Sequence, residues 1–194
     1  MTTNQYLSAF AIALTFYGFY PYIRSILSNK VKPHVFSWVI WATTTFIVFF
    51  AQLEGGGGVG AWPTGVSAII TCYVAYLAYK GIGDINITRL DWVFFITAMS
   101  SIPFWYITSD PLWAVIILTT VDVFGLAPTL RKAHDKPFEE SVQFYGIITV
   151  RNLISIIALD IYSTTTILFP AVVAFFCVVL IVVVIYRRHE LNKQ

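Results

Sequence analysis

TTILFPAVVAFFCVVLIVVVIYRR, the segment from Thr165 to Arg188, contains no charged residue before its two terminal arginines. A helix of this length reaches about 36 Å at 1.5 Å per residue. That exceeds the roughly 30 Å of hydrocarbon in a bilayer. The segment Thr165–Arg188 is therefore predicted to be a membrane-spanning helix.

Six more apolar segments of similar length precede it. They are Gln5–Leu27, His34–Leu53, Ala61–Lys80, Leu90–Thr108, Pro111–Arg131 and Glu140–Ile161. Of the 194 residues, 58% are hydrophobic and 11% are charged, whereas soluble domains carry about 25% charged residues. This composition excludes a soluble domain and a disordered chain, and the net charge of +2 gives no reason to expect a nucleic-acid partner. We predict an all-α integral membrane protein that is embedded in the lipid bilayer by seven transmembrane helices.

The basic residues set the predicted orientation. With seven spans, 11 of the 12 lysines and arginines fall on one side of the membrane. These eleven are Arg24, Lys30, Lys32, Lys80, Arg89, Arg131, Lys132, Lys136, Arg187, Arg188 and Lys193. The opposite loops carry Glu54, Asp110 and Asp160. Because basic loops favour the cytoplasm, we expect the N-terminus outside and the C-terminus in the cytoplasm. The membrane expected is the bacterial inner membrane.

An internal repeat relates the two halves of the chain. Pro21 matches Pro128 and Arg24 matches Arg131, both at an offset of 107. The further matches are Lys32-Pro33 with Lys136-Pro137, Ser37 with Ser141, Trp62-Pro63 with Phe169-Pro170, and Tyr79-Lys80 with Tyr186-Arg187. We predict a first triple-helix bundle in residues 1–82, a linker helix in 83–109, and a second bundle in 110–194. An odd number of linker spans lets the two bundles share one orientation, as a parallel repeat.

This arrangement of three, one and three spans resembles the SWEET and PQ-loop transporter superfamily. The resemblance rests on Pro21 and Pro128, although Tyr22 and Thr129 stand where the family has glutamine. The third and seventh spans also lack the asparagine seen in sugar-transporting members. The resemblance implies seven helices in two parallel repeats and transport by alternating access.

Prolines within the segments predict hinges. Pro21 and Pro128 lie near the basic ends of the first and fifth segments. A proline there removes a helix hydrogen bond and produces a bend, so we assign both to a gating hinge; a static kink is the alternative. Pro63 and Pro170 are expected to open their helices.

Two charged residues fall inside apolar segments. Asp122 and Arg151 lie at similar depths in consecutive, antiparallel segments. An unpaired charge there costs at least about 2.5–3.5 kcal/mol. Two interpretations stay open. The residues could form an ion pair, direct or bridged by water, that fixes packing. Alternatively, Arg151 could hold an anionic group of a solute, with Asp122 as its counter-ion or a proton acceptor.

Uncharged polar and aromatic residues flank this level, as a small-solute pocket requires. The candidate substrate-binding residues are Arg151, Asp122, Asn152, Tyr145, Trp41, Gln143 and Thr149. Trp38, nearer the end of its segment, is predicted to be an interfacial belt residue. The glycine run Gly55–Gly58 lacks the Gly-Lys-Ser/Thr ending of a nucleotide loop and is expected to be a flexible outer loop.

The function predicted is transport of a small polar solute by alternating access, as a facilitator or coupled to protons. The alternative is a receptor or sorting protein of the same fold that binds a small ligand without moving it. An enzyme is not expected, because the sequence has no HExxH, GxSxG or paired-carboxylate arrangement. No metal or cofactor is implied, and the sequence leaves open whether the chain forms a homo-oligomer.

Overall fold

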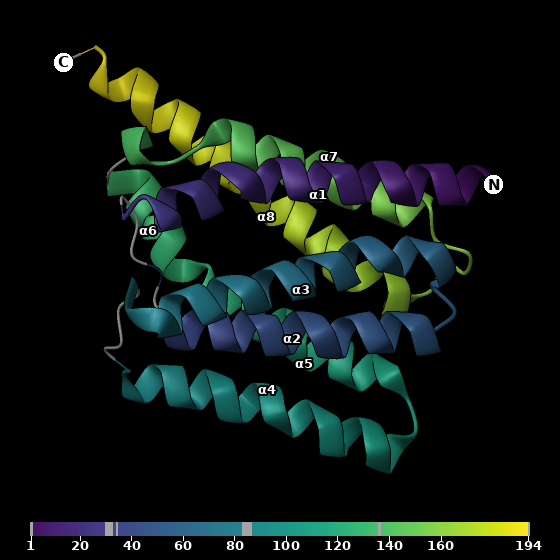
Figure 1. The fold of residues 1–194 in the computed structure, drawn as a ribbon. Coiled ribbons are helices and arrows are strands. Elements are labelled where there is room, and N and C mark those ends of the chain that lie inside the picture. The colour runs from purple at the N-terminus through teal and green to yellow at the C-terminus, as the bar shows by residue number, and fades with distance from the viewer. Residues whose placement is uncertain (1, 30–32, 34, 83–86, 136, 194) are drawn as a thin grey trace.

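Every regular element in the described chain is a helix (Figure 1). The structure is a computed structural model that describes residues 2–29, 33, 35–82, 87–135 and 137–193. The helices are α1 (Thr3–Leu27), α2 (Val35–Glu54), η1 (Gly58–Ala61), α3 (Trp62–Leu77), η2 (Ala78–Ile82), α4 (Arg89–Thr108), α5 (Pro111–Gly125), α6 (Ala127–Asp135), η3 (Pro137–Glu139), α7 (Val142–Ile157) and α8 (Thr164–Leu191). The all-α class predicted from the sequence is confirmed.

Four described helical segments are long and apolar enough to cross a membrane. They are Thr3–Leu27, Val35–Glu54, Gly58–Gly81 and Thr164–Leu191. Three shorter apolar helices, Trp92–Thr108, Pro111–Gly125 and Val142–Ile157, occupy the positions of the other expected spans. Each predicted segment therefore contains an apolar helix, in the predicted order. A helix of 15 residues such as α5 covers only about 23 Å, so seven full crossings stay a prediction.

The fifth segment differs from its prediction as one helix over Pro111–Arg131. It is divided at Leu126, where α5 has ended at Gly125 and α6 is about to begin. A proline has no N–H to donate to the preceding turn, and its ring crowds that turn. Pro128 is therefore accommodated in the first turn of α6, where proline is tolerated.

The other helix prolines behave differently. α1 continues through Pro21, and the hydroxyl of Ser25 donates to the Pro21 carbonyl at 2.8 Å. Pro170 lies inside α8, so the prediction that it opens its helix is wrong. The helix begins earlier because Ser163 and Thr166 form a capping box, in which each side chain accepts the other residue's backbone N–H.

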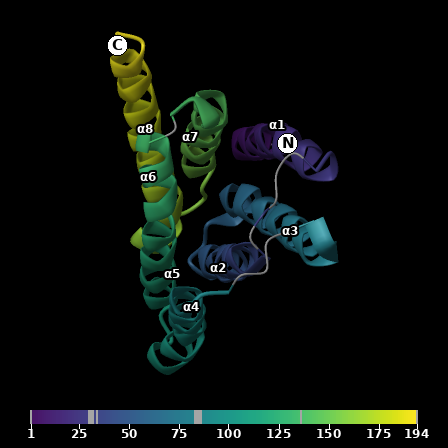
Figure 2. The ribbon, with the colours of Figure 1, turned by 90° about the vertical axis from the view of Figure 1, so that its left-hand side faces the viewer.

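Two groups of three helices make up the bundle. α3 packs against both α1 and α2, and α8 packs against both α5 and α7. We call α1, α2 and α3 the first triplet, and α5, α7 and α8 the second triplet. Between the triplets, α1 packs against α7 and α2 against α5 (Figures 1 and 2). α4, between the triplets in the chain, packs against α5 and α2.

The outer surface of the bundle is apolar, while its interior holds small and polar side chains beside the buried apolar ones. On α1, for example, Phe10, Phe16 and Tyr20 are exposed, whereas Thr15 and Ala11 are fully buried. Exposed rings on one side and small residues on the other suit a helix between lipid and protein.

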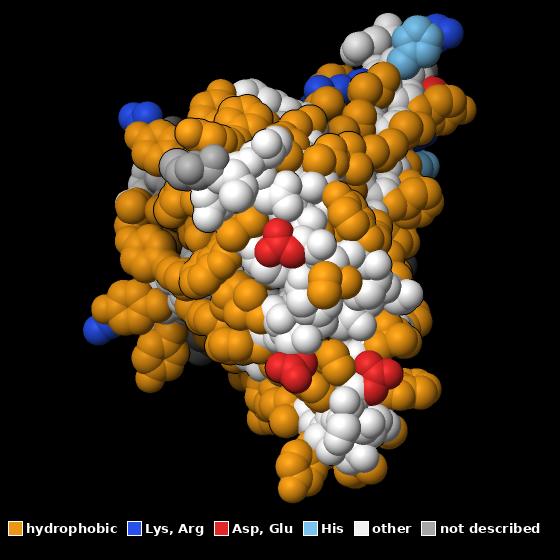
Figure 3. Space-filling view, turned by 90° about the vertical axis from the view of Figure 1, so that its right-hand side faces the viewer, with side chains coloured by type: hydrophobic (Ala, Val, Ile, Leu, Met, Phe, Trp, Pro, Cys, Tyr) orange, Lys and Arg blue, Asp and Glu red, His pale blue; other side chains and the backbone are white. Residues whose placement is uncertain are grey.

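Outside the buried Arg151, the described lysines and arginines lie at one end of the bundle, and three acidic residues mark the other end. Glu54 ends α2, Asp110 caps α5, and Asp160 follows α7. All three belong to the end shown in Figure 3, where acidic side chains lie on the end face and the visible basic ones lie toward its margins. We call this the acidic end. The other, basic end carries Arg24, Lys80, Arg89, Arg187 and Arg188. Lys30, Lys32 and Lys136, which contribute to the predicted asymmetry, lie outside the described residues.

Candidate functional site

Arg151 lies near the middle of α7 and reaches into the first triplet. Its Nε donates to Thr15 Oγ1 on α1 at 3.1 Å. Its Nη2 donates to Ser67 Oγ on α3 at 2.5 Å and to the carbonyl of Pro63. Only 4% of the side chain is exposed. One guanidinium therefore joins three helices across the boundary between the triplets.

Every described partner of this guanidinium is neutral. Within the described part of the chain, no Asp or Glu forms an ion pair with it. A guanidinium carries five N–H donors, and four hydrogen bonds account for all but one of them, on Nη1. Burying a charge without a counter-charge costs several kcal/mol. Arg151 is thus a buried positive charge with one donor left over.

Asn152 holds the guanidinium in place from the same helix. Its Oδ1 accepts from Arg151 Nη1 at 2.7 Å, and its Nδ2 donates to the Ile148 carbonyl at 2.9 Å. Asn152 is fully buried. The side-chain amide is thereby fixed in orientation, and it fixes Arg151 in turn. We call Arg151, Asn152, Thr15, Pro63 and Ser67 the arginine cluster.

Asp122 belongs to a second group of residues, on α5 and α2. Its Oδ1 accepts from Thr44 Oγ1 at 3.3 Å, and Thr44 is fully buried. The Asp122 side chain itself is half-buried. None of the described residues forms an ion pair with this carboxylate either.

A row of aromatic rings, Tyr22, Trp38 and Trp41, ends near Gly125, one turn from Asp122. Tyr22 stacks on Trp38 with centroids 5.3 Å apart, and Trp38 meets Trp41 edge to face, also at 5.3 Å. A Cβ added to Gly125, one turn beyond Asp122, would lie 3.4 Å from Trp41 Nε1. We call Asp122, Thr44 and Trp41 the aspartate cluster. Trp38 is 9% exposed, so its predicted place at the interfacial belt is wrong: neighbouring rings cover it.

Asp122 and Arg151 are not paired in the structure. Each makes its hydrogen bonds to other residues, in the aspartate and the arginine cluster respectively. The reason is the packing order: α8 is the helix that packs against both α5 and α7. α5 and α7, which carry Asp122 and Arg151, are therefore not packed directly against each other, although their segments are consecutive in the sequence.

The remaining candidates lie toward the basic end of α7. Gln143 is exposed, and its Nε2 donates to the Tyr17 hydroxyl at 3.3 Å. Tyr145 is buried and donates to the Glu140 carboxylate. Thr149 bonds to the Tyr145 carbonyl in its own helix at 2.8 Å. A contact of these three with a solute stays a prediction.

Sequence reasoning did not select Thr15, Thr44 or Ser67 for the site. Thr15 and Ser67 are single hydroxyls in apolar segments, and Thr44 is the middle of three consecutive threonines. Such groups usually bond to their own backbone. Thr15 and Thr44 do so, to the Ala11 and Trp41 carbonyls. Their contacts with Arg151 and Asp122 come from helix packing. The signal in the sequence that could have selected these residues is that polar side chains lie at the same depth as the two buried charges.

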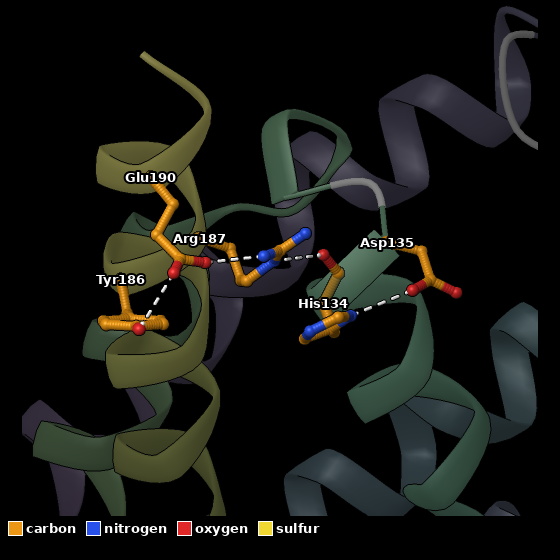
Figure 4. A network of polar contacts seen from close by, with 5 residues as sticks. All are labelled: His134, Asp135, Tyr186, Arg187 and Glu190. Atoms are coloured by element: carbon orange, nitrogen blue, oxygen red, sulfur yellow. Dashed lines mark hydrogen bonds and ion pairs between the residues drawn. The ribbon is translucent and has the colours of Figure 1, made fainter. Parts of the chain in front are cut away.

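At the basic end, a polar network holds α6 against the end of α8 (Figure 4). Arg187 Nε donates to the His134 carbonyl at 3.1 Å, and its Nη1 pairs with Glu190 at 2.5 Å. Arg188 donates to the carbonyls of Pro137 and Glu140 at 3.1 and 2.8 Å. The segment after the break in the fifth span is therefore fastened by α8 and not by α5 alone.

Comparison with known proteins found no matching family model, no matching curated protein and no matching solved structure.

Proposed function

We propose that this protein carries a small polar solute across a membrane by alternating access, with the solute site between the two triplets. The seven apolar helices would all span the membrane. The basic end would face the cytoplasm under the positive-inside bias, which puts the N-terminus outside. The residues that would contact the solute come from the arginine and aspartate clusters.

The packing order supports an internal repeat. In each triplet, the third helix in sequence packs between the first and the second: α3 in one and α8 in the other. The contacts between triplets are reciprocal, because the first helix of each meets the second helix of the other. This is the contact pattern of a parallel repeat about an axis along the membrane normal. Two such bodies can rock against each other, which is what alternating access requires.

The observation that carries the proposal is Arg151 at the boundary between the triplets. A buried guanidinium with only neutral described partners costs free energy that packing alone does not recover. Buried charges within membranes commonly mark solute or ion pathways. A solute with an anionic or strongly polar group would compensate this charge through the remaining Nη1 donor.

The prolines supply sites where the helices can bend. α1 contains Pro21, and the helix of the fifth segment is interrupted at Leu126, two residues before Pro128. Both lie on the basic-end side of the buried charges. A bend at each would open that end while the rest of each triplet moves as a body.

The test is uptake by the purified protein in liposomes. A panel of sugars, amino acids, organic acids and vitamins would be offered, with and without a pH gradient. We expect saturable uptake of one chemical class, and loss of about tenfold or more with Arg151→Gln, since a charge-assisted hydrogen bond contributes about 1.5–3 kcal/mol.

The matched control is Ser101→Ala. Ser101 is fully buried and bonds only to the Ala98 carbonyl of its own helix α4, so this variant removes a buried hydroxyl outside the site. Its uptake should equal that of the parent. Thermal stabilisation by one solute without any uptake would instead favour the receptor or sorting function. Uptake unaffected by Arg151→Gln would place the site elsewhere.

A further inference from the structure

The loop between α2 and α3 is bound to the turn between α7 and α8, across the boundary between the triplets. The Gly57 carbonyl accepts from the Asp160 N–H at 3.3 Å, and the Gly56 carbonyl accepts from the Ile161 N–H at 3.1 Å. These bonds join backbone to backbone at the acidic end. The sequence predicts a flexible loop at Gly55–Gly58, whereas the structure holds it by its carbonyl groups.

Side chains add three more bonds at the same end. Ser155 Oγ donates to the Gly60 carbonyl at 2.8 Å. Asn4 Nδ2 donates to Asp160 Oδ1 at 3.1 Å. Gln52 Nε2 donates to the Thr166 carbonyl at 2.8 Å. Each bond joins one triplet to the other, so two backbone and three side-chain hydrogen bonds connect the triplets at the acidic end.

Glycine is required for this closeness. A Cβ on Gly60 would lie 2.5 Å from the Leu159 nitrogen and 2.7 Å from the Ala158 carbonyl carbon. Both are backbone atoms, so no change of side-chain rotamer relieves the clash. Gly58 has a φ of +55°, and its Cβ would collide with the Asp160 carboxylate. Any larger residue at Gly60 separates the two loops.

The basic-end half of the same boundary is different. On that side of Arg151, the polar bonds between triplets among the described residues are Gln143 to Tyr17 and Thr44 to Asp122, each at 3.3 Å. Elsewhere α1 meets α7 through apolar contacts such as Phe19 with Phe144. Among the described residues, hydrogen bonds between the triplets are thus more numerous from Arg151 to the acidic end than on the basic-end side.

We infer that the loop Gly55–Gly60 and the turn at 158–161 form a gate at the acidic end, and that the structure shows this gate closed. We call them together the acidic-end gate. The inference rests on the proposed function, because a carrier with a site at mid-depth needs a seal that breaks and reforms on each side of it. A few backbone and hydroxyl bonds between two loops can break without unpacking either triplet.

Thr64 provides a reporter beneath the gate. It is 1% exposed, and its hydroxyl has no hydrogen-bond partner in the described structure. It follows Pro63, whose carbonyl contacts Arg151. Thr64→Cys would therefore be tolerated and would react with a membrane-impermeant thiol reagent only when the gate opens. Glu54→Cys lies at an exposed position of the same end. Its labelling measures the fraction of protein molecules inserted in the vesicle with the acidic end facing the reagent.

The experiment measures the labelling rate of these cysteines in sealed vesicles, with no solute added. The chain carrying only its native Cys72 and Cys177 sets the background. We expect Thr64→Cys to react at least about tenfold more slowly than Glu54→Cys. Adding Gly60→Ala should raise the Thr64→Cys rate severalfold, and adding Ser155→Ala should raise it by less. Gly146→Ala is the matched control, because a Cβ there meets nothing within 4 Å.

A second readout covers the case in which Gly60→Ala fails to fold. Amide deuterium exchange at Asp160 and Ile161 should accelerate in Ser155→Ala relative to the parent. Equal labelling of Thr64→Cys and Glu54→Cys in the parent would overturn the gate. So would unchanged labelling and exchange in folded Gly60→Ala and Ser155→Ala. Because no solute is used, the labelling and exchange results do not depend on whether the liposome assay detects transport. Uptake by a protein whose Thr64→Cys labelling and amide exchange show no opening would overturn the gate and leave the proposed transport standing.

Discussion

Arg151 Nε donates a 3.1 Å hydrogen bond to Thr15 Oγ1, which joins the second helix of one triplet to the first helix of the other. The Thr15 hydroxyl donates to the Ala11 carbonyl at 2.9 Å, so it accepts from the arginine while it stays bonded to its own helix. Thr15→Val removes this acceptor and keeps the shape of the side chain. We expect a loss of about 0.6–1.7 kcal/mol in unfolding free energy, measured by thermal unfolding. Thr97→Val, at an exposed hydroxyl bonded only within α4, is the control and should leave stability unchanged.

Arg151→Lys separates charge from geometry. Lysine keeps the positive charge but lacks the planar fork that serves acceptors on α1 and α3 together. We expect this variant to unfold at a lower temperature than the parent and to retain more uptake than Arg151→Gln. Uptake falling equally in both variants would show that the fork, and not the charge, is what the solute needs.

Asp122→Asn tests the aspartate cluster. The amide is the same size as the carboxylate but cannot take up a proton, and it can still accept from Thr44 Oγ1. We expect a stable protein whose uptake is strongly reduced and no longer responds to a pH gradient. Thr44→Val keeps the carboxylate and should retain the pH response. A full pH response in Asp122→Asn would remove this residue from any proton pathway.

Gly18 on α1 faces side chains of α7. A Cβ there would lie 3.3 Å from Ile147 Cγ2, so a large side chain would push the two helices apart. Gly18→Leu should lower the unfolding free energy by about 1–3 kcal/mol. Gly146→Ala, which meets open space on α7, should be neutral or stabilising by up to about 1 kcal/mol. The same thermal-unfolding assay compares the two; equal stability would argue against close packing at Gly18.

Arg187→Ala tests the attachment of α6. The change removes the donor to the His134 carbonyl and the pair with Glu190. We expect faster amide exchange across residues 129–135, with little change in the melting temperature, because partly exposed pairs contribute about 0–1 kcal/mol. Tyr186→Phe removes a bond to Glu190 and leaves the His134 contact intact, so its exchange in α6 should match that of the parent.

The helices themselves followed from hydropathy and local signals. The first segment was predicted over Gln5–Leu27 and is α1 at Thr3–Leu27, and the fourth was predicted over Leu90–Thr108 and is α4 at Arg89–Thr108. The gathering of the described basic residues at one end also followed from the sequence, because the composition of each loop can be read along the chain. The break at Leu126 was missed, since Pro128 and Pro21 look alike in sequence while only one interrupts its helix.

The sequence by itself determined the class of protein, the order of its helices and the residues whose burial would be costly. Only the tertiary structure decided what those residues touch. Arg151 contacts Thr15 and Ser67, not Asp122, because α8 is the helix that packs against both α5 and α7. The tertiary structure likewise decided that the glycine loop is held in place, because the turn that binds it, just before α8, is distant in the sequence. Hydropathy acts residue by residue along the chain, whereas hydrogen-bond partners depend on which helices become neighbours.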